Sequence, residues 1–322
     1  MAEVVARLGS LAKVEEPLGV RTTYRVGGAA RVLVTAHSAD DVVAAGQAAI
    51  EARLPVLVVG NGSNLLVADA GFDGVAVVLG EEFFDISRAN TASGPQIVAG
   101  AAVALPVLAR RSVALGLAGL EWMVGVPGTV GGGVRMNAGG HGADMITTLV
   151  GVTIADVAAG RVIERDAAEL GLRFRGSTLK STDVVLSASF RASVPPMADA
   201  GHGGPTGEKL LTDIVRWRRE NQPGGQNAGS VFVNPYDGAD SAGRLVDEAG
   251  LKGLRHKSAQ VSPKHANFIQ ADQGGSADDV LELMRIVADK VHSLHGIKLR
   301  SEVRLVGFNT TEFQTEHSED RQ

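Results

Sequence analysis

The sequence predicts an α+β protein with more than one domain. Short runs rich in β-branched residues alternate with stretches in which apolar residues recur at helical spacing, on both sides of a Pro- and Gly-rich segment. A chain of 322 residues, 44% of them hydrophobic, is long enough for two or three domains with their own cores. The most apolar stretch, Ala99–Ala109, is far shorter than the roughly 20 residues that cross a bilayer, so no membrane insertion is expected.

Composition excludes several classes of function. The formal net charge of −5 argues against nucleic acid as a partner. The absence of cysteine excludes disulfides, iron–sulfur clusters, thiolate zinc sites and a cysteine nucleophile, and no other metal-binding cluster stands out in the sequence. The N-terminus has acidic residues and no unbroken apolar segment, which argues against a signal peptide and favours a cytoplasmic protein.

The first elements lead into a glycine loop. A strand is expected at Arg31–Thr35, followed by a helix that Ser38 caps and that reaches Arg53. After Pro55 ends this helix, a wholly apolar strand at Val56–Val59 runs directly into the loop Gly60–Asn64.

The remaining elements divide at a linker. Further strands are expected at Val75–Leu79, Ile97–Ala99, Leu149–Ile154 and Val184–Phe190, and a helix at Leu105–Leu115. Residues 192–207 are rich in Pro, Gly and Ala without periodicity, which indicates a linker and a domain boundary. Beyond it we expect a smaller α+β unit with helices at Glu208–Glu220 and Ala277–His292, a strand at Glu302–Val306 and a flexible polar tail at 309–322.

The loop GNGSN is a candidate anion site. Its residues are Gly60, Asn61, Gly62, Ser63 and Asn64, and its glycines allow positive φ, so that successive N–H groups can surround a phosphate. The loop matches neither the G-x-G-x-x-G nor the Walker pattern, and a tight turn between two strands is an equally simple interpretation.

A second glycine segment strengthens the ligand interpretation. Eight of the eighteen residues in GVPGTVGGGVRMNAGGHG, residues 125–142, are glycine. Within it we expect a short helix to begin near Thr129 and to add N–H donors for an anion, and two such loops predict a dinucleotide. The alternative is a purely structural crossing between strands. The candidate cofactor residues here are Pro127, Gly128, Thr129, Gly132 and Gly133.

Several longer motifs carry a family resemblance. The chain resembles the UDP-N-acetylenolpyruvoylglucosamine reductases, and more specifically their shorter second subtype, over nearly its whole length. The motifs occur in the family's order: TTYRVGG at Thr22, GNGSN at Gly60, GLEWMVGVPGTVGGGVRMNAGGHG at Gly119, FRGSTLK at Phe174, AGSVFVNP at Ala228, LVDEAGLKG at Leu245, AQVSPKHANFI at Ala259 and SEVRLVG at Ser301.

The resemblance implies a fold and a reaction. The fold is that of FAD enzymes of the vanillyl-alcohol-oxidase type, with FAD-binding subdomains at 1–80 and 81–207, a substrate-binding domain at 208–300, and residues 301–308 free to return to the second subdomain. The reaction is the reduction of UDP-N-acetylglucosamine enolpyruvate by NADPH through noncovalently bound FAD, in peptidoglycan precursor synthesis. No obligate protein partner is implied.

Three residues match the family's catalytic positions. They are Arg175 in FRGS, Ser230 in AGSVF and Glu302 in SEVR. Hydride delivery to an enol ether pushes negative charge onto the adjacent carboxylate, where a guanidinium can bind through two parallel N–H bonds. Glu302 can assist at that carboxylate only when protonated, and the hydroxyl of Ser230 is suited to deliver the proton to carbon.

Other positions depart from the pattern or remain open. Asn221-Gln222-Pro223 stands where the family often has a phosphate-binding lysine, so phosphate binding is expected to rest on other residues. Arg218 and Arg219 lie nearby, but arginines on an amphipathic helix more often form its solvated face. Asn234 and His265 match positions close to the substrate. The rival hypotheses are an FAD-dependent alcohol oxidase of the same fold, which would produce peroxide, and a noncatalytic flavin-binding or nucleotide-binding module.

Overall fold

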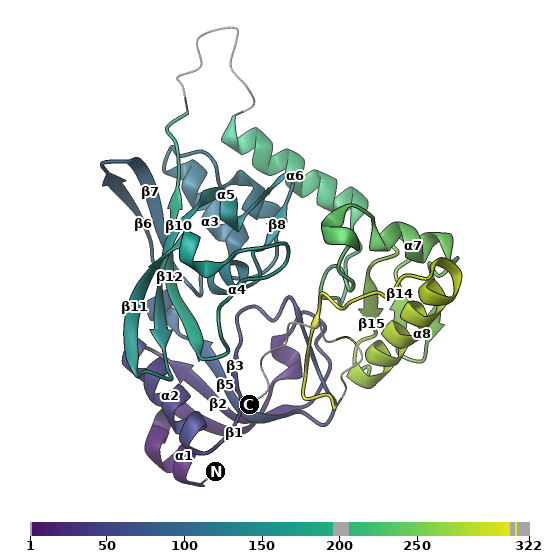
Figure 1. Cartoon of the computed structure of the whole chain (residues 1–322), viewed down its shortest axis with the longest axis horizontal. Coiled ribbons are helices and arrows are strands. Elements are labelled where there is room, and N and C mark those ends of the chain that lie inside the picture. Colours follow the sequence, from purple (N-terminus) through teal and green to yellow (C-terminus); the bar gives the residue numbers. More distant parts are fainter. Residues whose placement is uncertain (1, 196–205, 310–312, 314–322) are drawn as a thin grey trace, which may run out of the picture. The chain divides into compact units, whose positions relative to one another are not determined.

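A computed structural model describes residues 2–195, 206–309 and 313 (Figure 1). Its mixture of helices and strands confirms the α+β prediction. The residues divide into a first unit, Met1–Ala12, Val34–Gly60 and Ala76–Glu220, and a second unit, Lys13–Leu33, Asn61–Val75 and Asn221–Gln322. Most of the predicted linker and tail lies outside the described residues, and the predicted domain boundaries stay a prediction. No described helix has the length and hydrophobicity needed to cross a bilayer.

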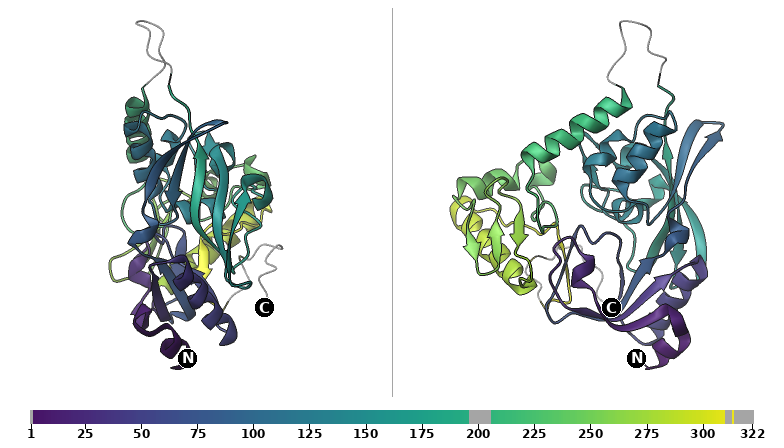
Figure 2. Two further views of the ribbon diagram at one scale, coloured as in Figure 1. Left: turned by 90° about the vertical axis from the view of Figure 1, so that its left-hand side faces the viewer. Right: turned by 180° about the vertical axis from the view of Figure 1, so that it is seen from behind.

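A five-stranded sheet organises the first unit. Its order is β11 (Arg161–Asp166), β10 (Leu149–Asp156), β12 (Asp183–Arg191), β7 (Gly94–Gly100) and β6 (Ile86–Thr91), with antiparallel neighbours throughout. Figure 2 shows this layer from two further sides. The central strand β12 is mostly buried whereas the edge strands carry exposed polar residues, the pattern of an antiparallel sheet with protected edges.

Helices pack around this sheet. Phe190 of β12 is opposite Ile97 of β7, and both side chains are fully buried. Each such burial stabilises the fold by about 1.5–3 kcal/mol. The helix α4 (Val130–Arg135) lies against β12, and α3 (Leu105–Ala114) buries Leu105 and Leu108.

Serine side chains cap the starts of two helices that the sequence predicts. Ser38 accepts a hydrogen bond from the Asp41 N–H at the start of α2 (Ala39–Glu51), as expected. Ser276 plays the same part for α8 (Ala277–His295), which ends at Gly296 with φ +72°. Both caps satisfy N–H groups that have no acceptor within the helix.

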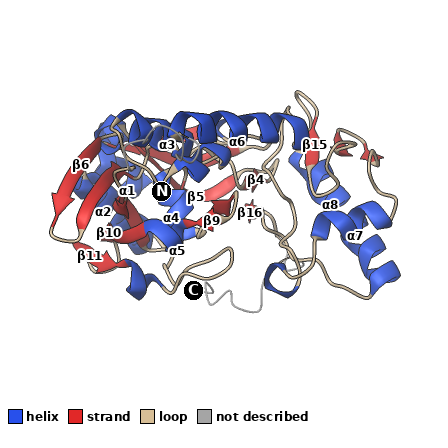
Figure 3. Ribbon diagram, turned by 90° about the horizontal axis from the view of Figure 1, so that it is seen from above, coloured by secondary structure: helices blue, strands red, loops and turns tan. Residues whose placement is uncertain are grey.

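The second unit has its own core. The helix α8 packs against the small sheet β13 (Arg255–His256), β14 (Ala259–Val261) and β15 (Ile269–Ala271), and α7 (Ala242–Glu248) packs against α8. Figure 3 shows both helices and β15. Phe232, Leu245 and Met284 are among its buried side chains.

Two strands far apart in the sequence pair in the second unit. β4 (Leu65–Val67) runs parallel to β16 (Arg304–Val306), with Leu66 opposite Leu305. β4 begins directly after the loop GNGSN, and β16 begins two residues after Glu302. The pairing therefore places the glycine loop and the segment of Glu302 side by side.

Another sheet has the order β1, β2, β5 and β3, and β2 and β5 contain residues of both units. The bounds of the other helices and strands are α1 Ala2–Leu8, β1 Ala12–Pro17, β2 Ala29–Ala36, β3 Val56–Val58, β5 Phe72–Leu79, β8 Gly139–Gly140, β9 Ala143–Asp144, α5 Met145–Thr148 and α6 Gly207–Asn221.

Candidate active site

The loop GNGSN is an ordered turn between β3 and β4. In its second-unit part Gly62 has φ +59°, and its carbonyl accepts a hydrogen bond of 3.2 Å from the Thr23 N–H. A Cβ at Gly62 would lie 2.5 Å from the Cα of Thr22, so both the backbone angle and the space require glycine. Asn61 is exposed, and Ser63 and Asn64 are half-buried.

The first unit joins the start of this loop to the second glycine segment. A Cβ at Gly60 would lie 2.4 Å from Oγ1 of Thr129, and the Thr129 side chain is buried. The structure thus brings together residues of two motifs that the sequence suggested as parts of one cofactor site. The close approach also shows why Gly60 carries no side chain.

The helix predicted near Thr129 is present as α4, but two of the N–H groups expected to bind an anion donate to carbonyls of the protein instead. Thr129 is the N-cap of α4. The Val130 N–H donates to the Val103 carbonyl at 2.8 Å, and the Gly131 N–H donates to the Ala101 carbonyl at 2.9 Å. Since these two donors already have acceptors, they are not available to an anion, contrary to the simple expectation for a helix N-terminus.

Packing explains other glycines of the segment. A Cβ at Gly133 would meet Cε of Met145 at 2.4 Å, inside the core of the first unit. One at Gly125 would meet Nε2 of His141 at 2.4 Å, and this imidazole lies edge-on to Trp217 with ring centroids 5.1 Å apart. Burial and the charge of Arg218 lower the pKa of His141. Of the remaining candidates, Pro127 and Gly128 directly precede the N-cap Thr129, and Gly132 lies within α4.

Arg175 is displayed on a tight turn of the first unit. The Arg173 N–H donates to the Gly176 carbonyl at 2.9 Å, and the Gly176 N–H donates back to the Arg173 carbonyl at 3.0 Å. Arg175 has φ +54°, which is uncommon for a residue with a side chain. Its guanidinium lies 5.2 Å from the centre of the Phe174 ring. No sequence signal predicts this backbone conformation.

Asn137 holds that turn in place and was missed by sequence reasoning. The side chain is buried; its Nδ2 donates to the Arg173 carbonyl at 3.1 Å, and its Oδ1 accepts from the Ile146 N–H at 3.1 Å. A second link is the Ser177 hydroxyl, which donates to the Arg135 carbonyl at 2.8 Å. The glycine segment therefore supports the turn that carries Arg175.

Ser230 and Glu302 come together in the second unit. The Glu302 N–H donates to the carbonyl of Val231, the residue after Ser230, at 2.8 Å. On its other side the Glu302 carbonyl accepts from Nδ2 of Asn64 at 3.0 Å, while the Arg304 N–H donates to the Asn64 carbonyl at 2.9 Å. Asn64, the last residue of GNGSN, is thus hydrogen-bonded to the backbone that carries Glu302.

A second buried amide, Asn267, supports the segment of Ser230. Its Nδ2 donates to the Phe232 carbonyl at 2.8 Å and its Oδ1 accepts from the Phe232 N–H at 3.0 Å. The residue lies in the motif AQVSPKHANFI, which is one of the motifs that carry the family resemblance. The single hint was a polar residue in an otherwise apolar run.

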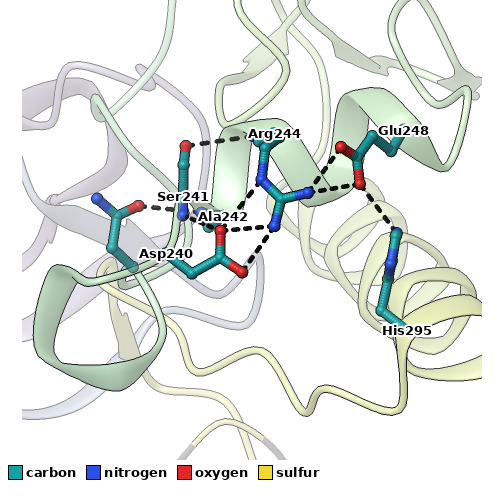
Figure 4. A network of polar contacts seen from close by, with 7 residues as sticks. Asp240, Ser241, Ala242, Arg244, Glu248 and His295 are labelled. Carbon is teal, nitrogen blue, oxygen red and sulfur yellow. Dashed lines mark hydrogen bonds and ion pairs between the residues drawn. The ribbon is translucent and has the colours of Figure 1, made fainter.

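Asn234 and His265 also lie in the second unit, with structural contacts. Oδ1 of Asn234 accepts from the Ala242 N–H at 3.1 Å, at the start of α7. Figure 4 shows the network at the start of the same helix, in which Arg244 lies between Asp240 and Glu248. Nδ1 of His265 accepts from the Asn267 N–H at 3.2 Å.

The protonation state of His265 follows from its surroundings. Burial and the charge of Lys252 lower its pKa, and Nδ1 can accept a hydrogen bond only when it carries no proton. Both observations indicate a neutral imidazole at neutral pH.

Comparison with known proteins gives a consistent assignment. Residues 221–306 match the domain family described as "UDP-N-acetylenolpyruvoylglucosamine reductase, C-terminal domain", and residues 30–166 match "FAD binding domain". The chain is 37% identical to the UDP-N-acetylenolpyruvoylglucosamine reductase of Rubrobacter xylanophilus, over 94% of this chain and 97% of that protein. It is 38% identical to the enzyme of Heliobacterium modesticaldum, over 91% and 90%.

A solved structure is also similar. The crystal structure of the UDP-N-acetylenolpyruvylglucosamine reductase of Thermus caldophilus matches with a TM-score of 0.75 and 32% identity, covering 92% of this chain and 99% of that one.

Proposed function

The chain belongs to the UDP-N-acetylenolpyruvoylglucosamine reductase family, and on that basis we propose that it reduces UDP-N-acetylglucosamine enolpyruvate to UDP-N-acetylmuramate with NADPH and FAD. The observation that carries this proposal is the joining of Ser230 and Glu302 through Val231, next to the loop GNGSN, because it unites three separate motifs in one place. The relatives give no support to an alcohol oxidase or a noncatalytic module.

The glycine loops fit a flavin dinucleotide. Packing against the protein's own atoms requires glycine at positions 60 and 62, so support for FAD comes from the match of residues 30–166 to the FAD binding domain and from the family. We assign FAD binding to residues 60–64 and to Pro127, Gly128, Thr129, Gly132 and Gly133. When bound, FAD supplies hydride transfer from NADPH to the enol ether.

The chain's own residues supply charge and a proton. Reduction of the carbon–carbon double bond adds a hydride to the terminal carbon and a proton to the carbon that bears the ether oxygen. Ser230 delivers this proton and is reprotonated from solvent. Arg175 neutralises the charge that develops on the carboxylate, and protonated Glu302 donates a hydrogen bond to it. Asn234 and His265 are proposed to contribute to substrate binding.

Separate measurement of the two half-reactions tests this assignment. With purified protein, NADPH oxidation should depend on the enolpyruvyl UDP-sugar, and stopped-flow spectra should show flavin reduction by NADPH followed by reoxidation by the sugar. Ser230→Ala should reduce the flavin at the normal rate and slow its reoxidation by at least about 100-fold, the usual value of acid catalysis. Equal slowing of both phases would rule out Ser230 as the proton donor. A rate of NADPH oxidation that does not depend on the enolpyruvyl sugar would rule out the proposed function.

We also propose that FAD is bound noncovalently. Because it is noncovalent, FAD should stay in the supernatant when the protein is precipitated with acid. Yellow colour in the pellet would show a covalent flavin instead.

A further inference from the structure

The side chain of Asn267 binds both the N–H and the C=O of one residue, Phe232. Its side-chain amide donates to the Phe232 carbonyl at 2.8 Å and accepts from the Phe232 N–H at 3.0 Å, as a neighbouring β-strand would. Its own backbone carbonyl accepts from the Val231 N–H at 2.9 Å. With an exposed fraction of only 4%, Asn267 makes these bonds out of contact with water.

The opposite edge of the same segment carries Glu302. The Val231 carbonyl accepts from the Glu302 N–H at 2.8 Å, and the Val233 N–H donates to the Arg300 carbonyl at 2.9 Å. The residues that follow Ser230 are therefore held between Asn267 and the segment 300–302. Phe232 is fully buried and gives this segment an apolar anchor in the core.

On its other side Ser230 follows a glycine turn. Gly229 has φ +77°, and its N–H donates to Oδ1 of Asn227 at 3.0 Å. The bonds of Asn267 to Val231 and Phe232 fix the backbone directly after Ser230, on which the position of its hydroxyl depends.

We propose that Asn267 is a positioning residue for Ser230, which fixes the backbone of Val231 and Phe232 so that the hydroxyl meets the substrate carbon. This inference rests on the proposed function, because it takes Ser230 as the proton donor. Small displacements of a reacting group reduce the reaction rate by up to about 100-fold. Loss of the Asn267 hydrogen bonds should therefore slow proton delivery by Ser230 and leave the rate of flavin reduction by NADPH unchanged.

The isosteric variant Asn267→Asp gives a pH-dependent test. Its carboxylate would accept from the Phe232 N–H but would face the Phe232 carbonyl without a proton to donate. Once protonated, the carboxylic acid offers one donor and one acceptor and restores the amide's pattern. Burial raises the pKa of such a carboxyl group, which brings its protonation into an accessible pH range.

Other titratable groups near this site are common to variant and wild type. The elements that pack on Asn267 and Phe232 bring His265 from the same loop, Arg300 and Glu302 from the C-terminal segment, and Arg244 from α7, whose Gly243 adjoins Asn267. Asn267→Ser carries no carboxylate, so the ratio of its rate to the wild-type rate at each pH shows the contribution of these groups, and the recovery of Asn267→Asp is compared with it.

The experiment measures both half-reactions between about pH 5.5 and 8 for wild type, Asn267→Asp and Asn267→Ser. At pH 8 flavin reoxidation by the enolpyruvyl UDP-sugar should fall about 10- to 100-fold in both variants, while reduction by NADPH changes less than twofold. For Asn267→Asp alone, the ratio of the variant to the wild-type rate of flavin reoxidation should rise toward one as the pH falls. Val287→Ala, a buried change on α8 that leaves the Asn267 hydrogen bonds in place, is the matched control for lost stability and should leave both phases unchanged.

The outcomes separate the two proposals. If wild-type protein does not turn over the enolpyruvyl sugar, the proposed function fails. If the wild type turns over and the variants slow both phases equally, slow neither, or show no recovery of Asn267→Asp at low pH, the positioning role is wrong. Failure of both variants to fold, with Val287→Ala folded, would assign the amide to stability alone and would also overturn the proposal.

Discussion

Three side-chain amides hold the backbone beside the three candidate catalytic residues. Asn137 binds the turn of Arg175, Asn64 binds the carbonyl of Glu302, and Asn267 binds the segment after Ser230. An amide suits this task because it donates and accepts at once and carries no charge that burial would penalise. Each candidate residue is thus oriented by a neutral partner that leaves the charge of the site unchanged.

The close contacts of Gly62 lead to a stability prediction. Gly62→Ala adds left-handed strain of about 1–2 kcal/mol and a clash with Thr22 that costs a further 1–3 kcal/mol. We expect the purified variant to be colourless or weakly yellow and to melt at a lower temperature, measured by absorbance and thermal unfolding.

Gly116→Ala is the control, because Gly116 has φ +71° and no atom within 4 Å of the added Cβ. It should keep its flavin and show the strain alone. Equal flavin loss in both variants would show that strain, and not the crowding beside GNGSN, decides cofactor binding.

His265 predicts a pH dependence of stability. Its pKa is lowered in the folded chain, so below about pH 6.5 the unfolded state binds the proton more readily than the folded state. The contribution of His265 to the free energy of unfolding is therefore complete above that pH and is lost as the pH falls.

Urea denaturation at pH 7.5 and 5.5 measures this effect. His265→Gln should lose less stability than wild type between the two pH values. His141, whose pKa is also lowered, is present in both proteins and cancels from the comparison. Identical losses would contradict a neutral His265.

At the scale of elements, the sequence predicted the helices α2, α3, α6 and α8 and strands such as β10 and β12, whereas β1, β6, β11 and the small sheet β13–β15 were not predicted. The missed contacts have a physical reason. Ser38 lies next to the helix it caps, so local chemistry was sufficient to identify it. Asn267 binds Phe232 at a separation of 35 residues, and Asn137 binds Arg173 at 36. No periodicity or turn rule links such positions, so the sequence suggested the catalytic residues through motifs but not their supports.

The long helix α8 depends on a residue from a distant loop. The Asp69 carboxylate accepts from the Ala277 N–H at 3.0 Å and the Asp278 N–H at 3.3 Å, at the positive end of the helix. Asp69→Ala should lower the free energy of unfolding by about 1 kcal/mol in urea titrations. Asp73→Ala removes only an exposed ion pair with Arg31 and should change it by less than about 1 kcal/mol. A smaller loss for Asp69→Ala than for Asp73→Ala would contradict the capping role.

At the scale of the whole molecule, the glycine loop depends on the end of the chain. A protein that ends at Val303 lacks β16, which leaves the backbone of β4 unpaired and the side chain of Leu66 without its neighbour Leu305. We expect this protein to purify without flavin. A protein that ends at Asn309 keeps β16 and should remain yellow, although it loses the contact of Phe313 with Phe232. Flavin retention by the shorter protein would show that β4 holds the loop without its partner.

The pairing of β4 with β16 also sets an order of events during synthesis. The ribosome makes Leu65–Val67 well before their hydrogen-bonding partners Arg304–Val306. The loop GNGSN therefore reaches its final setting only after residues 304–306 have left the exit tunnel. We expect FAD to be bound after that point and not by a shorter nascent chain.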